Sequence, residues 1–458
     1  MSERPTIFAL SSGRPPAAIA VIRVCGPRAG AALETLIGRV PQPRQAALAR
    51  VREPQSGEVI DEALALWFPA PHSETGEDMA ELQLHGGHAV VAAVLDALGK
   101  INGCRVAEPG EFTRRAFENG RLDLTAVEGL ADLIAAETAA QGRQAFRQLK
   151  GLIGDRAEAW RQRLIEALAL VEARIDFSDE ADVPEDLVAP ALAAAKQLRG
   201  EIAASLADGG RGERLRDGLV VAIAGPPNAG KSTLLNRLAR REAAIVSPYP
   251  GTTRDVIEVH LDLGGFPMIL LDTAGIRDSS DPIEQEGVRR ARERAAAADL
   301  VLWVTDASAD GAAAGSVDES LSKTETWVLR NKSDLLADRP LNDTCKSGPT
   351  HANATSPVLA VSAATGAGID ALVQALATHA RDYFAAVESA VVTRARHRRA
   401  LEDTVTALNR TLEIGICGRD EVIAEELRAA ATTLGRLTGK IDVEDVLEAI
   451  FREFCIGK

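Results

Sequence analysis

The chain has 458 residues, of which 46% are hydrophobic and 26% are charged, and its formal net charge is −14. This length predicts about three domains, each large enough to bury a core without disulfides or structural metals. The five cysteines are scattered and form no CxxC pair, which excludes a disulfide framework and a zinc site. No apolar run approaches the ~18 residues that a membrane span needs, so we expect a cytoplasmic protein without a membrane partner. The acidic balance and an aromatic content of 3% argue against a dedicated nucleic-acid-binding module.

Short apolar runs separated by turn residues dominate the first part of the chain. Residues 1–119 contain strand-like runs such as Ala18 to Val24 and Ala80 to Leu84, and one helical stretch from His88 to Leu98. This pattern predicts a small α/β domain. From about Thr125, strong helix formers with apolar residues three and four apart predict long helices, and the same texture returns after residue 383.

Between these helical regions, strand-like apolar runs alternate with helical segments, which predicts βαβ units and a mostly parallel sheet. The economical interpretation is an α/β multi-domain protein with an insertion. We expect an N-terminal α/β domain (residues 1–119), a discontinuous helical domain (120–214 and 383–458) and an inserted α/β domain (215–382).

A phosphate-binding motif follows the first strand-like run of the insert. Gly225 to Ser232 fits G-x-x-x-x-G-K-[S/T] and stands between the run Leu219 to Ala224 and a helical segment. The glycines let backbone amides turn inward around phosphate oxygens, Lys231 adds a charge at the β/γ-phosphates, and Ser232 offers a hydroxyl to magnesium. The alternative without a ligand is a Gly-Pro turn before a helix. The strand–loop–helix context disfavours this interpretation.

Three further motifs stand at strand ends in the order that a guanine-nucleotide switch requires. Asp272 to Gly275 can hold magnesium through its water and touch the γ-phosphate. Asp334, in the motif Asn331 to Asp334, can accept two hydrogen bonds from guanine, and Ser362 to Ala364 offers a backbone amide to the guanine carbonyl. Each motif alone could be a strand-end turn. Together they predict that the insert (215–382) is a Ras-like P-loop GTPase domain with GTP or GDP as the bound nucleotide.

Pro250 to Asp255 is a candidate switch loop, in which Thr253 can reach magnesium only when the γ-phosphate is present. The position after Gly275 is Ile276, whereas many small GTPases carry a glutamine there that orients the attacking water. Hydrolysis must therefore recruit another group. The acidic residues nearby are either candidates for this role or an exposed helical turn: Asp278, Asp281, Glu284 and Glu286.

These motifs resemble the MnmE/TrmE family of bacterial tRNA-modification GTPases over essentially the whole chain. The resemblance also rests on the segment from Pro109 to Asp123 and on the terminal Cys455-Ile-Gly-Lys458. It implies a GTP-hydrolysing enzyme that works with an FAD-dependent, MnmG/GidA-like partner and a one-carbon tetrahydrofolate in its 5-formyl or methylene form. The implied reaction adds a (carboxymethyl)aminomethyl group at C5 of the wobble uridine of tRNA. The alternative from another class is a GTP-dependent ribosome-assembly switch that binds RNA without covalent chemistry.

The same resemblance assigns roles to several side chains. Without it, the sequence would predict that these side chains are merely solvated or ion-paired. It implies a homodimer formed through the first domain, a hetero-oligomer with the flavoprotein, and a folate site at Arg23, Glu81, Arg121 and Lys458. Cys455 becomes a candidate nucleophile. In place of an arginine finger, the resemblance implies a potassium ion, with Glu284 orienting the attacking water. FAD is expected only in the partner, because no G-x-G-x-x-G follows a strand here.

The expected nucleotide site comes from the motifs and the resemblance together. Its residues are Asn228, Ala229, Gly230, Lys231, Ser232, Thr233, Ser247, Pro248, Tyr249, Pro250, Gly251, Thr252, Thr253, Asp272, Thr273, Ala274, Gly275, Asn331, Lys332, Asp334, Ser362, Ala363 and Ala364. Within this set the expected magnesium ligands are Ser232 and Thr253, and the expected potassium ligands are Asn228, Ser247, Tyr249 and Thr252. Because the chain is acidic, we expect a more basic partner to supply much of the contact with tRNA phosphates.

Overall fold

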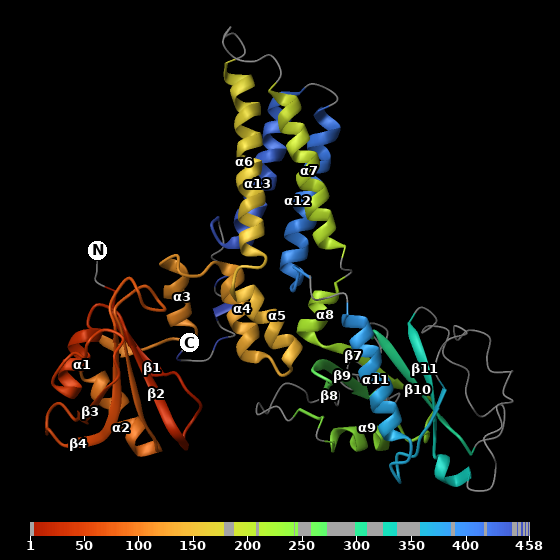
Figure 1. The fold of residues 1–458 in the computed structure, drawn as a ribbon, viewed down its shortest axis with the longest axis horizontal. Coiled ribbons are helices and arrows are strands. Elements are labelled where there is room, and N and C mark those ends of the chain that lie inside the picture. Colours follow the sequence, from red (N-terminus) through yellow and green to blue (C-terminus); the bar gives the residue numbers. More distant parts are fainter. Residues whose placement is uncertain are drawn as a thin grey trace, which may run out of the picture. The chain divides into compact units, whose positions relative to one another are not determined.

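The structure, a computed structural model, is shown in Figure 1. It describes residues 4–177, 187–207, 210–241, 243–245, 258–272, 298–308, 324–336, 358–385, 390–415, 419–441, 447, 450–451, 454 and 457. Packing divides the chain into two units, one of Met1–Ala131, Arg147–Arg199 and Asp403–Lys458, the other of Asp132–Phe146 and Gly200–Glu402. These units are defined by packing, so the domain boundaries expected from the sequence stay predictions. No helix in the described ranges is both long and apolar enough to cross a membrane.

Six strands near the N-terminus form the sheet expected of the first domain. They are β1 (Thr6–Leu10), β2 (Ala17–Cys25), β3 (Ala47–Arg52), β4 (Val59–Phe68), β5 (Met79–Gly86) and β6 (Cys104–Val106), in the order β3-β4-β5-β2-β1-β6. Alternation along β2 and β5 sends Ile22, Leu82 and Leu84 to one face of the sheet. Helices α1 (Ala29–Ile37) and α2 (His88–Gly99) bury that face.

The opposite face of this sheet is only partly covered. At one end, Phe112 of α3 (Glu111–Glu118) packs with Cys25 and Met79. Farther along, Ile19, Leu48 and Leu64 remain 61%, 66% and 40% exposed. Leu48 pairs in register with Leu64, so these side chains form an apolar surface that we call the open sheet face.

Long helices follow, as the helix-forming composition predicts. In Figure 1, α6 (Gly154–Asp176) lies beside α13 (Asp420–Thr438), and Arg428 donates a hydrogen bond to Glu172 across them at 2.6 Å. The helices α7 (Val188–Leu206) and α12 (Ala395–Gly415) meet where Gly415 lies against Leu192. A Cβ on Gly415 would stand 2.6 Å from the end of the Leu192 side chain, so a larger residue there would require that side chain to shift.

The helix α4 (Leu124–Ala135) begins against the C-terminal tail. Its Leu124 and Val127 are buried with Phe451 and Phe454, which directly precedes Cys455. Aromatic and aliphatic burial of this kind fixes the tail to the first unit, since a fully buried side chain of this size stabilises by ~1.5–3 kcal/mol.

The inserted sheet has the alternating pattern of a nucleotide-binding fold. Its strands are β7 (Leu219–Ala224), β8 (Glu258–Leu263), β9 (Phe266–Asp272), β10 (Leu300–Asp306), β11 (Glu325–Asn331) and β12 (Val358–Ala360), in the order β12-β11-β10-β7-β9-β8. Among these strands only the β8–β9 hairpin pairs antiparallel, so the mostly parallel sheet is confirmed. Helices α9 (Lys231–Ala239) and α11 (Ile369–Phe384) bury their leucines against it.

Three short elements complete the described fold. They are α5 (Ala139–Leu149), α8 (Arg211–Asp217), which leads into β7, and the 3-10 turn Ser333–Leu336 after β11.

Candidate functional site

The loop between β7 and α9 has the backbone that a phosphate site requires. Gly225 has φ +136°, and a Cβ there would lie 2.1 Å from the Val304 carbonyl oxygen. Gly230 has φ +92°, and a Cβ there would lie 2.3 Å from Nδ2 of Asn331. Asn228 is also left-handed, with φ 63°. Left-handed positions in such a loop let consecutive backbone amides converge on an anion.

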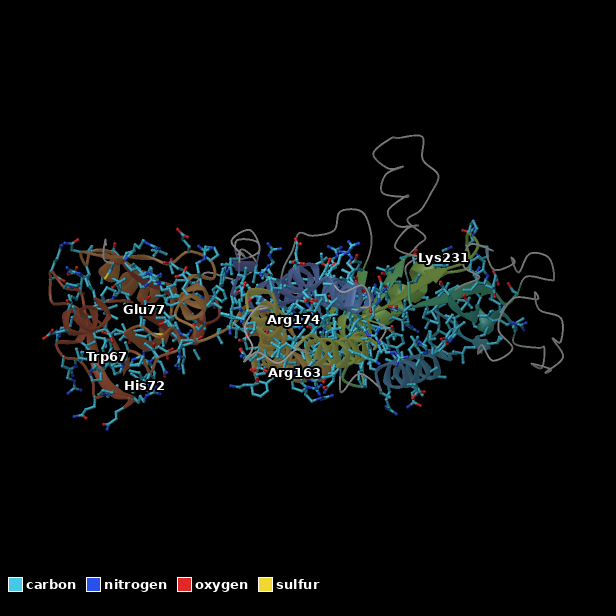
Figure 2. All side chains as sticks on the ribbon, turned by 90° about the horizontal axis from the view of Figure 1, so that it is seen from above. Trp67, His72, Glu77, Arg163, Arg174 and Lys231 are labelled. Carbon is cyan, nitrogen blue, oxygen red and sulfur yellow. The ribbon has the colours of Figure 1, made fainter. Side chains whose placement is uncertain are left out.

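Lys231 is the first residue of α9, and Figure 2 marks its position. Its Nζ donates hydrogen bonds to the carbonyls of Gly225 at 2.8 Å and Pro226 at 2.9 Å. Burial lowers the pKa of Lys231, while the carboxylate of Asp272 acts in the opposite direction. The loop's own carbonyls therefore hold the ammonium where phosphate oxygens can replace them.

Ser232 and Asp272 come together from opposite sides of the phosphate loop. The Ser232 hydroxyl donates to Oδ2 of Asp272 at 2.9 Å. A hydroxyl and a carboxylate are the hard oxygen donors that magnesium prefers, so this pair fits the expected ion. The described residues contain no cluster of three or more His, Cys, Asp or Glu side chains placed to hold a metal.

Asn331 joins two loops of the site and is 1% exposed. Its Nδ2 donates to the Ala229 carbonyl at 2.7 Å, and its Oδ1 accepts from the Ala363 amide at 2.9 Å. The Ser362 hydroxyl donates to Asp334 at 2.5 Å. The phosphate loop and the two base-side motifs thus meet at the carboxyl edge of the parallel strands, where such folds bind ligands.

Asp306, at the end of β10, belongs to the same edge and was not among the predicted residues. Its Oδ2 accepts a hydrogen bond from Lys332 Nζ at 2.7 Å. Hydrogen bonds from Lys332, and secondarily from Ser308, lower the pKa of Asp306 to about 2. The pair fixes the Lys332 side chain two residues before Asp334. A carboxylate directly after a strand-like run was the signal in the sequence that could have found Asp306.

Arg23 and Glu81 are cross-strand neighbours on the first sheet, and Arg23 Nε donates to Glu81 at 2.9 Å. Arg23 also pairs with Glu74, with 2.7 Å between Nη1 and Oε2. The Arg121 side chain passes Gly76 in the loop that carries Glu74. Three of the four expected folate residues therefore gather at this loop. Glu74 was missed because the sequence does not tell which way a loop side chain points.

The end of the C-terminal tail reaches this sheet. Ser11 Oγ donates to the Gly457 carbonyl at 2.7 Å, and Gly457 has φ +101° with no space for a Cβ beside the Leu10 carbonyl. Ser11 itself bonds through its amide to Val21, two residues from Arg23 in β2. Gly457, which stands between Cys455 and Lys458 in the sequence, thus lies against the strand pair that carries Arg23.

Cys25 is the thiol inside the first domain, close to Glu77, which Figure 2 labels. Burial raises the pKa of Cys25 to about 12, although a hydrogen bond with Thr75 acts in the opposite direction. A thiol with such a pKa carries almost no thiolate at neutral pH and is no nucleophile. Cys104, the other described cysteine, is half-buried, and burial raises the pKa of its thiol as well, so both described thiols are weak nucleophiles.

Several predicted site residues lie outside the described ranges, and their roles stay predictions. They are Ser247, Pro248, Tyr249, Pro250, Gly251, Thr252, Thr253, Thr273, Ala274, Gly275, Glu284, Cys455 and Lys458.

Comparison with known proteins settles the family. Residues 6–121 match the family model described as "GTP-binding protein TrmE N-terminus", and residues 124–455 match the model of the "MnmE helical domain". The chain belongs to the MnmE/TrmE family. The expected family, the α/β multi-domain fold with its inserted P-loop domain, and the assignment as a GTPase enzyme are thereby confirmed.

Relatives of this MnmE/TrmE chain match it from end to end. A protein of Rhodopseudomonas palustris named "tRNA modification GTPase MnmE" is 56% identical over 99% of this chain and 99% of its own length. Proteins of the same name from Bradyrhizobium sp. strain ORS 278 and from Parvibaculum lavamentivorans are 57% and 54% identical over 99% of this chain, and these matches cover 99% and 100% of the relatives.

Replacing Asn331 with alanine should weaken guanine-nucleotide binding through the loops that it joins. The Asn331→Ala variant leaves the buried Ala229 carbonyl and Ala363 amide unpaired, at ~1–3 kcal/mol for each group. We expect GDP affinity to fall by about tenfold or more, measured with a fluorescent GDP analogue. Asn236→Ala, at an exposed position of α9, is the control and should bind normally. Equal affinities for the two variants would contradict the bridging role.

Proposed function

We propose that this chain hydrolyses GTP and, with an FAD-dependent partner and a one-carbon tetrahydrofolate, adds a (carboxymethyl)aminomethyl group at C5 of the wobble uridine of certain tRNAs. The name of the relatives, tRNA modification GTPase, supports tRNA as the substrate. The observation that carries the finer chemistry is the hydrogen bond from Ser11 to Gly457 at 2.7 Å, which holds the Cys455 tail against the sheet of Arg23. A ribosome-assembly switch, the second candidate, has no use for such a tail.

The side chains around Arg23 suit a reduced folate. The Glu81 carboxylate can accept the donor edge of a pterin, while Arg23, Arg121 and Lys458 supply positive charge for the glutamate tail. The folate, when bound, supplies the one-carbon unit. Cys455 is proposed as the nucleophile beside it, because the terminal segment Cys455 to Lys458 matches the family. FAD is proposed to enter only with the partner.

The nucleotide site suits GTP hydrolysis without a glutamine. Lys231 binds the β/γ-phosphates, Asp334 recognises guanine, and Ser232 with Thr253 holds magnesium, which offsets phosphate charge when bound. Potassium, held by Asn228, Ser247, Tyr249 and Thr252, is proposed to offset the charge that develops at the β/γ bridge. Glu284 orients the attacking water.

The open sheet face supports a homodimer. Ile19, Leu48 and Leu64 are exposed there, and a second copy of the chain is proposed to cover them. GTP turnover would close the GTPase domains of the dimer and reorganise the modification centre. The flavoprotein completes a cytoplasmic hetero-oligomer and supplies the basic surface that this acidic chain lacks.

Analysis of tRNA from cells that lack the chain tests the proposed function. We expect the C5 substituent of wobble uridine to disappear from digests examined by mass spectrometry. The unaltered gene should restore it, whereas Cys455→Ser should not, although its GTP hydrolysis should persist. Wobble uridines that keep their C5 substituents in the deletion strain would favour the ribosome-assembly switch.

Potassium should accelerate GTP hydrolysis. Ile276 cannot orient water, and Asn228 stands in the phosphate loop with an oxygen that can bind a monovalent cation. We expect hydrolysis to be about tenfold or more faster in potassium than in sodium at equal ionic strength. Asn228→Ala should lose this difference and Asn236→Ala should keep it. Equal rates in both salts for the unaltered chain would refute the potassium site.

Removing the Glu74 charge should strengthen folate binding. Glu74 neutralises Arg23 from the loop of residues 69–78, which Asn119 anchors by donating to the Thr75 carbonyl at 2.8 Å. Since an exposed pair of this kind is worth ~0.2–1 kcal/mol, Glu74→Gln should tighten 5-formyltetrahydrofolate binding by up to about fivefold in calorimetry. Glu62→Gln removes a comparable pair with Arg50 and is the control. Weaker binding by Glu74→Gln would mean that Glu74 holds the ligand itself.

A further inference from the structure

The GTPase domain is an insertion, so the chain must enter and leave it through two linkers. The entering linker is α8, and the leaving linker comprises residues 390–394 before α12. They touch directly at Gly212, where a Cβ would lie 2.2 Å from the Val392 carbonyl oxygen. No side chain fits between the two linkers, so they run in direct contact with each other. We call this pair of linkers the neck.

A single carboxylate forms hydrogen bonds to both linkers of the neck. Asp132 Oδ1 accepts from Nε of Arg216 in the entering linker at 2.9 Å and from Nη2 of Arg394 in the leaving linker at 2.6 Å. The side chains of Asp132 and Arg394 are only 13% and 12% exposed. Charge-assisted bonds that are shielded in this way resist screening by salt and fix geometry.

The helix α5, which follows Asp132, adds two bonds to the entering linker. Gln144 Nε2 donates to the Gly212 carbonyl at 3.0 Å, and Gln141 Nε2 donates to the Arg216 carbonyl at 2.9 Å. The Arg216 carbonyl stands in the last turn of α8, where carbonyls lack partners within the helix, whereas the Gly212 carbonyl stands in its first turn. The side chains of α5 thereby bind both ends of α8.

The start of α5 and the residues just before it contact the β8–β9 hairpin. The Ala140 amide donates to the Gly265 carbonyl at 3.0 Å, and Glu137 pairs with His260 at 3.3 Å. In the sequence this hairpin lies between the candidate switch loop, which ends at Asp255, and the motif that begins at Asp272. The hairpin that α5 contacts is therefore connected along the chain to both switch segments.

We infer that residues 132–146 are a clasp, which joins both linkers and the hairpin between the switch segments into one body with the GTPase sheet. Asp132 is then a positioning residue for coupling GTP turnover to the modification centre. We expect a movement of Asp132 to reach the modification centre through the helix α4. Asp132 stands in the same helix as Leu124 and Val127, which pack on the tail before Cys455.

Distances between spin labels test the clasp without reference to tRNA. Nitroxide amino acids, encoded genetically so that the native cysteines stay, replace the exposed Arg143 of α5 and the exposed Arg240 after α9. In the full-length chain we expect one narrow distance distribution, unchanged between GDP and GDP with aluminium fluoride in potassium. Asp132→Ala should broaden it. A distribution that shifts with the nucleotide in the otherwise unaltered chain would overturn the inference.

The coupling role of Asp132 rests on the proposed function and has its own readout. We expect Asp132→Asn to keep its rate of GTP hydrolysis, while tRNA modified per GTP hydrolysed falls by about fivefold or more. Asp403→Asn, at an exposed position of α12, is the matched control and should keep the full ratio. Gln141→Met, which removes one neutral hydrogen bond, should lower the ratio less.

The outcomes separate the two proposals. If hydrolysis and modification fall together in Asp132→Asn and in Gln141→Met, the residues maintain folding, and the coupling role is wrong. If the unaltered chain and its flavoprotein partner modify no tRNA, the proposed function fails, while the spin-label distances still decide whether the clasp exists.

Discussion

Because the GTPase domain is an insertion, the chain must enter it and leave it at neighbouring places. The contact of Gly212 with the Val392 carbonyl meets this constraint. The two linkers approach so closely that their backbone groups and charges need partners from elsewhere in the chain. Asp132 and the amide side chains of α5 supply them. The two linkers and most of α5 consequently belong to the same packed unit as the GTPase sheet.

The chemistry of the GTPase domain follows from its parallel strands. Each strand delivers one functional group at its carboxyl end: the phosphate loop after β7, Asp272 after β9, Asp306 after β10 and Asn331 after β11. Side chains that are far apart in the sequence therefore bond to each other, as Asn331 does with Ala229 and Ala363. The N-terminal sheet gathers its charged residues differently, through antiparallel register, which sets Arg23 opposite Glu81.

Much of this arrangement could be predicted from the sequence, because its signals are local. The spacing of Gly225, Gly230 and Lys231 specifies a loop whose left-handed positions only glycine adopts freely, and the structure has them. Short apolar runs located the strands, and composition located the long helices. Glu74 and Asp306 could not be assigned with the same certainty. Their roles depend on which cation lies opposite, Arg23 or Lys332, and that is set by packing.

The sequence by itself determined the class of the protein and its nucleotide, since a motif that binds phosphate or guanine works through residues a few positions apart. It also determined the family, through segments such as Pro109 to Asp123 and the terminal Cys455 to Lys458. Only the tertiary structure decided that Gly457 lies beside Ser11 and that Asp132 holds both linkers. These contacts join residues separated by 84 to 446 positions, so they follow from how helices and sheets pack and leave no trace in local spacing.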